Sequence, residues 1–376
     1  MFEDKDEESI HKDLLKNISD DYEKSTGYPT ADITKAFAIE ESKIYEILGE
    51  VIGMIDVDNL SSYELEKYVY QRKGISRLTG DYAKTQLIVN GNGIVVAGDK
   101  FQTPSGIQFA CIDSSVTING TGLVNIQCLQ VGIIGMVGAN SITQMPVTLQ
   151  GITSCTNLQA TTDGYEPETD AHLRQRYYEA LRMPPTSGNK YHYLKWAKEV
   201  NGVGNAEVYP LWNGANTVKI VIIDANSQPA SLDLVDEVQE HIDPKGTYDE
   251  STDTWSTWGT GSGEAPIGAY CTVESAASKA ITVKVKIEKS NSSYTDENIA
   301  SNIIKNISSY FTEIALNKEM NYVSYAKIGH LIFASEGVAD YDSNSLTVND
   351  ATSNIILSYD KNLTEIPIVS QVVLLQ

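Results

Sequence analysis

The sequence has little cysteine and no long apolar run. Its four cysteines include no CxxC pair, which predicts unpaired buried thiols in a protein made in a reducing compartment. The longest apolar run, LQVGIIGMVGA at 129–139, is too short and too rich in glycine to span a bilayer, so no membrane insertion is expected. The first residues, MFEDKDEESIHKD, have no basic region followed by an apolar one. We therefore expect no secretory signal.

Basic residues are scarce relative to acidic ones. The chain of 376 residues has 28 lysines and arginines against 50 aspartates and glutamates, which gives a net charge of −22. A surface this acidic repels phosphate backbones and anionic lipids, which argues against binding to nucleic acid or to a membrane surface. Because the charge also favours solubility, it suits a protein that stays unassembled until a partner arrives.

The sequence lacks the patterns of common enzyme and metal sites. Its five histidines have no HxxxH or HExxH spacing, and it contains no GxSxG, no Walker loop and no cysteine–histidine signature. The glycine-rich stretch GTGSGEAP at 259–266 has no lysine and no helix start after it, which is typical of a loop. We therefore expect no cofactor, no bound metal and no enzyme activity.

Three helices are predicted near the start of the chain. The first carries apolar residues every four positions from Ile10 to Tyr22, the second covers about 35–55 with Asp32 or Thr34 as its cap, and the third covers 62–73. Apolar residues of the second helix are spaced 7, 4, 3 and 4 apart, as in the seam of a helical bundle. They are Phe37, Ile44, Leu48, Val51 and Ile55. This seam packs either on its own domain or against helices of another chain.

The rest of the chain changes character twice. Alternating strands separated by glycine-rich turns, with NGNG at 90–93 as a hairpin turn, predict a small antiparallel β domain over 83–160. Helices and strands then mix, and YLKWAKEVNGVGNAEVY (193–209) and YAKIGHLIFASEGVADY (325–341) both have the pattern helix, Gly-Val, strand. The pattern is consistent with two α/β subdomains related by duplication. The predicted class is α+β and multidomain, with boundaries at 1–82, 83–160, 161–265 and 266–376.

One stretch, TTDGYEPETDAHLRQRYYEALR at 161–182, carries four carboxylates within eight positions. They are Asp163, Glu166, Glu168 and Asp170. An acid/base or cation site is one reading, but the spacing does not match a calcium loop. The other reading is a helix start, in which Thr169 caps, Asp170 meets the helix dipole and Leu173 opens the apolar face. Helix capping is favoured. Arg174 and Arg176 face either their own domain or a neighbouring subunit.

A second stretch, DESTDTWSTWGTGSG at 249–263, places Trp255 and Trp258 in a loop of small polar residues. Three interpretations stay open at this point. The loop folds over its own domain, it contacts a protein partner, or its tryptophans stack on a sugar.

The sequence resembles the baseplate J family in DGYEPETDAHLRQRYYEAL and in the following YHYLKWAKEVNGVGNAEVYPLWNGANTVKIVII. This family comprises wedge proteins of contractile phage tails, of the Mu-like, P2-like and defective-prophage kind, and of tail-like bacteriocins. The likeness covers roughly residues 30–376. The positions that match its pattern include Thr169, Asp170, Leu173, Arg174, Arg176, Trp196, Gly202 and Val203. Two departures are His172, where members often have a glutamate that completes a capping box, and a longer tryptophan loop.

The resemblance implies a structural role without known chemistry. A member of this family is expected to be made in the bacterial cytoplasm and to end in the tail baseplate, as part of homo- and hetero-oligomers. Its partners would be other wedge subunits, copies of itself, and hub and sheath-initiator proteins, and it would rearrange on contraction. The alternative reading is a glycan-binding tail-tip protein that uses Trp255, Trp258 and the many tyrosines.

Overall fold

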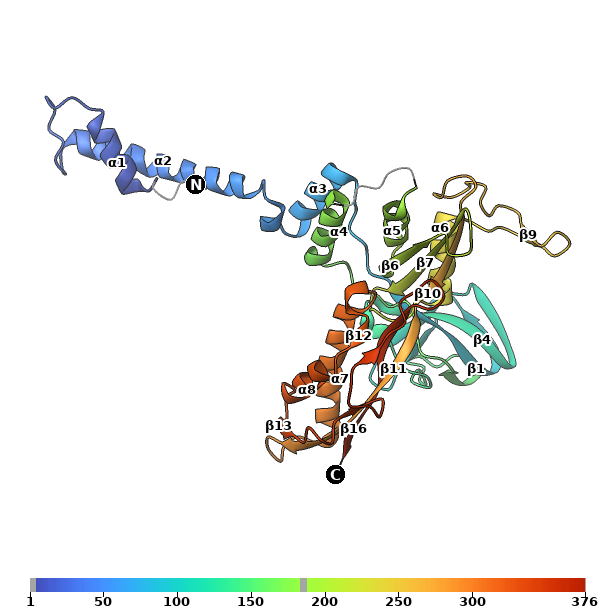
Figure 1. The fold of residues 1–376 in the computed structure, drawn as a ribbon. Coiled ribbons are helices and arrows are strands. Elements are labelled where there is room, and N and C mark those ends of the chain that lie inside the picture. Colours follow the sequence, from blue (N-terminus) through green and yellow to red (C-terminus); the bar gives the residue numbers. More distant parts are fainter. Residues whose placement is uncertain (1–4, 183–187, 376) are drawn as a thin grey trace. The chain divides into compact units, whose positions relative to one another are not determined.

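The computed structural model describes residues 5–182 and 188–375 (Figure 1). The described residues form two compact units. One contains the residues up to Arg77 together with Thr169–Arg182, and the other contains Leu78–Glu168 together with the residues from Gly188 onward. The predicted α+β class is confirmed, because N-terminal helices are followed by a β domain and by segments that mix helices with strands.

The first unit is helical. Its elements are α1 (Glu7–Lys16), α2 (Pro29–Gly53), η1 (Val57–Asn59), α3 (Ser62–Lys73) and α4 (Asp170–Arg182). Helix α1 packs on the first part of α2, where Ile10, Ala31 and Ala38 are buried. Helices α3 and α4 pack together around Leu65 and Leu173, both fully buried.

Two details of the predicted N-terminal helices are wrong. Helix α2 begins at Pro29, and its N-cap residue is Tyr28, which makes no side-chain cap hydrogen bond. Proline is favoured at the first helical position because its fixed φ is already helical and it has no N–H to satisfy. Thr34 instead donates its hydroxyl to the carbonyl oxygens of Thr30 and Ala31 inside the helix. Helix α1 ends at Lys16, so the periodic pattern that reaches Tyr22 continues beyond the helix.

The β domain of the second unit is one antiparallel sheet in the order β2-β3-β4-β1-β5. Its strands are β1 (Tyr82–Val96), β2 (Lys100–Gln102), β3 (Gln108–Cys111), β4 (Ser115–Val131) and β5 (Ile152–Asn157), with η2 (Ile133–Gly135) after β4. The core includes Phe101, Phe109 and Ile126, together with the buried Cys111, Cys128 and Cys155.

The predicted hairpin turn at NGNG is wrong. Residues 90–93 lie inside β1 and pair with β4, where Gly91 is opposite Gly120. A Cβ atom on Gly91 would lie 2.2 Å from the carbonyl oxygen of Gly151, and one on Gly93 would lie 2.3 Å from that of Gln150. The glycines therefore let the chain that enters β5 pass directly against β1, which is a use of glycine that a local turn signal cannot reveal.

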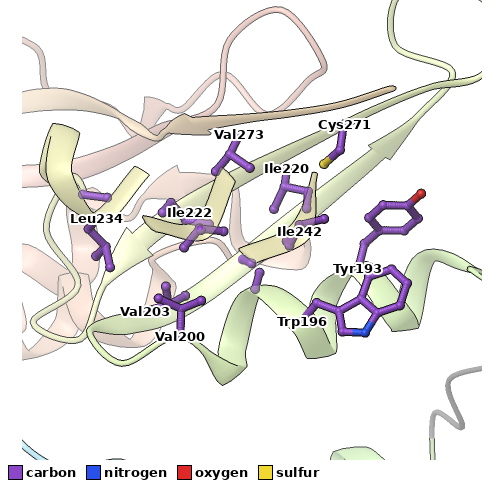
Figure 2. Close-up of a cluster of buried hydrophobic side chains, with 14 of the residues drawn as sticks. Tyr193, Trp196, Val200, Val203, Ile220, Ile222, Leu234, Ile242, Cys271 and Val273 are labelled. Carbon is purple, nitrogen blue, oxygen red and sulfur yellow. The ribbon is translucent and has the colours of Figure 1, made fainter. Parts of the chain in front are cut away.

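An α/β subdomain follows, with the sheet order β10-β7-β6. Its elements are α5 (Lys190–Glu199), β6 (Val203–Pro210), β7 (Thr217–Asp224), α6 (Leu232–Ile242), β8 (Tyr248–Asp249), β9 (Thr254–Trp255) and β10 (Tyr270–Ser275). Strand β7 pairs in parallel with β10 and antiparallel with β6. Figure 2 shows the core beneath α5 and α6, where Trp196 lies near Tyr193 and Ile220 and Ile222 project from β7.

The C-terminal subdomain is built on β11 (Ala277–Lys289), which pairs in parallel with β16 and antiparallel with β13 and β14. The remaining elements are α7 (Asp296–Ile314), η3 (Lys318–Met320), β12 (Tyr322–Val323), α8 (Tyr325–Phe333), β13 (Val338–Tyr341), β14 (Thr347–Val348), β15 (Ile355–Ile356) and β16 (Glu365–Leu375). Helices α7 and α8 cover a core that contains Val283, Ile303 and Ile328.

The two α/β subdomains share a sheet order but not a chain order. Each has a central strand with a parallel neighbour and an antiparallel one, β10 and β6 beside β7, and β16 and β13 beside β11, which also pairs antiparallel with β14. A helix, a glycine with positive φ and the antiparallel strand form the repeated pattern in both, at Gly202 and Gly337. This segment precedes β7 in the first subdomain and follows β11 in the second. Neither a tandem duplication nor a circular permutation produces that order, since the parallel strand comes last in both subdomains, as β10 and as β16.

Candidate functional site

The carboxylates of the 161–182 stretch that belong to the second unit each accept hydrogen bonds from other chain segments. Asp163 accepts from the hydroxyls of Tyr165 at 3.0 Å and Ser231 at 2.7 Å. Glu166 accepts from the backbone N–H of Ile133, and the buried Glu168 accepts from that of Leu78, both at 3.0 Å. Among residues 5–182 and 188–375, no group of three or more histidine, cysteine or acidic residues could hold a metal ion.

Tyr165 anchors this stretch in the core of the first α/β subdomain. Its side chain is 3% exposed, and burial raises the pKa of its phenol well above the usual value. The ring lies so close to Gly202 that a Cβ there would be 2.5 Å from the ring carbon Cε2. The side-chain amide of Asn226 also donates to the carbonyl oxygen of Gly164, at 3.1 Å. The arrangement positions backbone rather than a reacting group.

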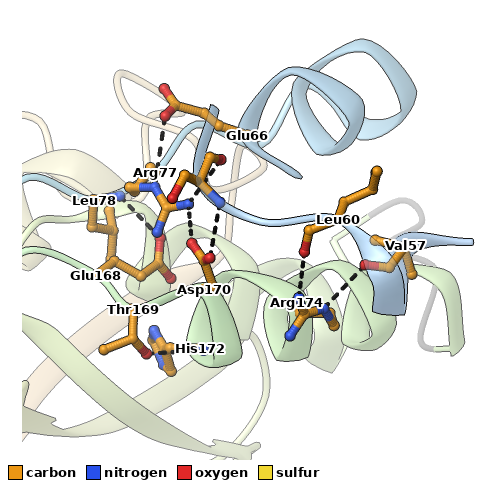
Figure 3. Close-up of polar contacts among 11 residues, drawn as sticks. Val57, Leu60, Glu66, Arg77, Leu78, Glu168, Thr169, Asp170, His172 and Arg174 are labelled. Atoms are coloured by element: carbon orange, nitrogen blue, oxygen red, sulfur yellow. Dashed lines mark hydrogen bonds and ion pairs between the residues drawn. The ribbon is translucent and has the colours of Figure 1, made fainter. Parts of the chain in front are cut away.

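The continuation of the stretch, at the start of α4, caps the helix within the first unit (Figure 3). Thr169 Oγ1 accepts the backbone N–H of His172 at 3.2 Å, which is the geometry of a helix N-cap. Asp170 accepts the N–H of Ser62 at 2.8 Å and pairs with the Arg77 guanidinium at 2.6 Å. The hydrogen bond from Ser62, and then that from Arg77, lower the pKa of Asp170.

Arg174 and Arg176 both donate to the backbone of their own unit. Arg174 donates to the carbonyl oxygens of Val57 at 3.1 Å and Leu60 at 2.7 Å, and so holds the turn before α3. Arg176 donates to the carbonyl oxygen of Ser76 at 3.2 Å. Leu173, which directly precedes Arg174, is fully buried in the core between α3 and α4. These arginines therefore stabilise the fold of the first unit.

Sequence reasoning missed the partners of these residues and two further buried carboxylates. Asp224, at the end of β7, accepts the N–H groups of Asn226 and Gln228, and burial raises its pKa to about 7. Asp243, fully buried after α6, accepts those of Gly259 and Cys271, and burial raises its pKa as well. An acid that directly follows an apolar strand, as in TVKIVIID, was the available signal for Asp224.

Four of the five residues of the predicted seam, from Phe37 to Val51, lie on an uncovered face of α2, and Ile55 lies two residues beyond the end of the helix at Gly53. The exposed fractions of its side chains run from 41% at Leu48 to 67% at Phe37, and Ile33, Ile47 and Met54 extend the same face. The face that α1 covers is another one, which carries Ala31, Thr34 and Ala38. An exposed apolar stripe of this length is typical of a protein contact.

The two tryptophans of the 249–263 stretch lie in different environments. Trp258 is half-buried, donates its indole N–H to the carbonyl oxygen of Cys271 at 2.8 Å and stacks edge-on with Tyr270. For Trp258 these contacts agree with the interpretation in which the loop folds over its own domain. Trp255 is 39% exposed and pairs with Tyr248 across a short hairpin. The family-motif residues Trp196 and Val203 are buried in the core of the same subdomain.

Models of three domains from one protein family match successive parts of the chain. The model described as the Baseplate J-like protein barrel domain matches residues 83–164, the Baseplate J-like central domain matches 185–275, and the Baseplate J-like protein C-terminal domain matches 280–375. Within the part of the chain that the structure describes, no helix has the length and apolar character needed to cross a membrane.

Three relatives extend the comparison. The uncharacterized protein YqbT of Bacillus subtilis strain 168 is 30% identical over 373 residues, 99% of this chain and 98% of YqbT. The phage-like element PBSX protein XkdT of the same strain is 29% identical over 376 residues, 100% of this chain and 99% of XkdT. Baseplate protein gp47 of Escherichia phage Mu is 28% identical over 158 residues, 40% of this chain and 44% of gp47. With three successive domains matched and relatives aligned along its whole length, the chain belongs to the baseplate J-like family.

Proposed function

We propose that this chain is a structural wedge subunit in the baseplate of a contractile phage tail or phage-tail-like particle. It links hub, sheath and neighbouring wedges, contacts copies of itself, and rearranges on contraction. Family membership supports this role, and so does the similarity to a Mu protein whose name is baseplate protein. The polar contacts of the 161–182 stretch agree with it, since three of its carboxylates, Glu166, Glu168 and Asp170, accept backbone N–H groups and so have a structural use.

The observation that carries the proposal is the exposed apolar face of α2. Beyond the part that α1 covers, six apolar side chains are spaced 3, 1, 3, 3 and 1 residues apart along one side of α2 and in the turn directly after it. They are Ile44, Ile47, Leu48, Val51, Met54 and Ile55, all at least 41% exposed. Since burial of each half-exposed side chain contributes about 1 kcal/mol, the face supplies on the order of 6 kcal/mol to association. That is a substantial share of the binding free energy of a specific protein complex.

The rearrangement draws its support from the division into two units. Each unit has its own hydrophobic core, and the chain passes between them three times, at Arg77–Leu78, at Glu168–Thr169 and after Arg182. Units with separate cores can change their relation without repacking either core. The finer division into 1–82 as an assembly region, 83–160, 161–265 and 266–376 belongs to the same proposal.

A pair of double variants tests the role of α2. Ile44→Asp with Leu48→Asp places two charges on the apolar face, where burial of a carboxylate is costly, so we expect baseplates not to assemble. Ser42→Asp with Gly49→Asp adds the same charge on the opposite side of the helix and should leave assembly intact. Circular dichroism establishes that both variants fold, and electron microscopy scores the particles. Normal baseplates with the folded Ile44 and Leu48 variant would show that this face is not an interface.

A further inference from the structure

Residues 246–256, which we name the arm, form an exposed two-stranded ribbon. Strands β8 and β9 pair antiparallel with Tyr248 opposite Trp255, and the two ring centroids are 5.0 Å apart. Every residue of the arm is exposed to solvent. Figure 1 shows it as a narrow projection that bears the label β9 and extends beyond its sheet. A two-stranded ribbon alone in water is marginally stable, so an arm of this kind gains most from a surface that covers it.

The base of the arm is fixed to its subdomain. The fully buried Asp243 accepts the backbone N–H groups of Gly259 and Cys271, at 3.0 and 2.9 Å. The Thr257 hydroxyl donates to the carbonyl oxygen of Pro244 at 2.8 Å. The Lys245 ammonium lies 5.9 Å from the ring centroid of Trp255 and 5.5 Å from that of Trp258. A rigid base lowers the entropy that the arm loses when a partner binds it.

The exposed side chains of the arm combine an aromatic pair with several acidic residues. Tryptophan and tyrosine are the residues most enriched at the energetic centres of protein interfaces, and here Trp255 and Tyr248 are side by side. Asp249, Glu250 and Asp253 surround them. The sequence has no lysine, arginine or histidine between Lys245 and Lys279 to balance these charges. The surface that receives the arm must therefore supply the positive charge.

We propose that the arm docks in a positively charged groove of a different protein, with Trp255 and Tyr248 at its apolar centre. A second copy of this chain is the poorer fit, because its net charge of −22 opposes the approach of an acidic arm. The proposal rests on the wedge role only in identifying that protein as another component of the same particle.

Photocrosslinking from the arm tests this proposal in assembled particles. A benzophenone amino acid replaces Thr252 in the full chain, in cells that produce the complete set of tail proteins, and mass spectrometry identifies the crosslinked peptide. We expect a peptide of net positive charge from another protein. Trp255→Ala, and Asp249→Asn with Glu250→Gln and Asp253→Asn, should each lower the crosslink yield at least about tenfold. The matched control Asp236→Asn, Glu237→Gln, Glu240→Gln alters the same charge on the exposed side of α6 and should leave the yield unchanged.

Several outcomes overturn the proposal. A crosslink to a second copy of the chain, or no crosslink in particles that contain the chain, rejects the arm contact and leaves the wedge role standing. Particles that lack the chain altogether reject the wedge role and this proposal with it. Binding of the unmodified chain to purified cell-wall polysaccharide that Trp255→Ala abolishes would assign the arm to glycan binding instead.

Discussion

Replacement of Asp224 by asparagine should change how the stability of the second unit depends on pH. Asp224 is 6% exposed, and burial raises its pKa to about 7, with a further contribution from the charge of Asp163. Its carboxylate accepts two backbone N–H groups, those of Asn226 at 2.9 Å and Gln228 at 2.7 Å. An asparagine oxygen can accept these bonds without carrying a charge.

The sign of the effect follows from proton binding. The pKa of Asp224 in the folded protein is above its unfolded value of 3.8, so the folded state binds the proton more tightly. Asp224 therefore contributes stability that is fully present below pH 3.8 and is lost as the pH rises through about 7. With one pKa unit equal to about 1.4 kcal/mol, the loss between pH 5 and pH 8 is roughly 2.5 kcal/mol.

Urea unfolding at pH 5 and pH 8, followed by tryptophan fluorescence, measures this difference. All four tryptophans, Trp196, Trp212, Trp255 and Trp258, lie in the second unit, so the signal reports on that unit alone. Between pH 5 and pH 8 the free energy of unfolding of the wild type should fall by roughly 2.5 kcal/mol more than that of Asp224→Asn. The exposed Asp233→Asn is the control and should behave as wild type. Equal pH dependence of wild type and Asp224→Asn would mean that Asp224 stays ionised across this range.

Substitutions at three further residues, each compared with a control or a measurement of its own, test the packing around the 161–182 stretch. Gly202→Ala places a Cβ 2.5 Å from the Tyr165 ring at a φ of +95°, and should cost more than about 2 kcal/mol in urea unfolding. Gly214→Ala, at a φ of +97° with open space around it, isolates the backbone strain and should cost about 1 kcal/mol; equal costs would deny the contact with the ring. Leu173→Ala should lower the thermal stability of the helical unit by about 2–5 kcal/mol, measured by circular dichroism of the full chain, and a neutral result would contradict the burial of α4. Arg174→Ala removes two bonds to backbone carbonyls and should destabilise the same unit by about 1–3 kcal/mol; Arg174→Lys, which lacks the two separate nitrogens that Arg174 uses, should recover only part of this loss.

Elements with local signals were predictable from the sequence. Helix α3 covers 62–73 and ends at Gly74, whose φ of +68° suits glycine, because capping and periodicity are encoded within a few residues. Helix α4 begins at Asp170 for the same reason, with Thr169 as its cap. The prediction of a turn at NGNG was wrong because these glycines make room for residues 150–151, which lie almost sixty positions further along the chain. No window around 90–93 contains that information.

The candidate site divides in the same way. Thr169 and Leu173 were assigned from helical spacing, whereas Arg77, the ion-pair partner of Asp170, is 93 residues away in sequence. Likewise the lysine or backbone partner of a carboxylate cannot be chosen from composition, since any of the chain's 28 basic residues is a formal candidate. Long-range polar pairs become visible only when tertiary packing has fixed which segments meet.

The acidic charge and the apolar face of α2 act together. A chain with six largely exposed apolar side chains on and directly after one helix risks association with itself before its partners are present. Between residues 40 and 55 the same helix carries Glu40, Glu41, Glu46 and Glu50 against the single Lys43. Two such helices from copies of the chain would bring like charges together along the edges of the apolar contact, and like charge opposes pairing. Since salt screens this repulsion while leaving apolar burial intact, the charge delays association without weakening the contact that a suitable partner makes. Under the proposed assembly role of this face, the net charge of −22 helps to keep the exposed seam available for its partner.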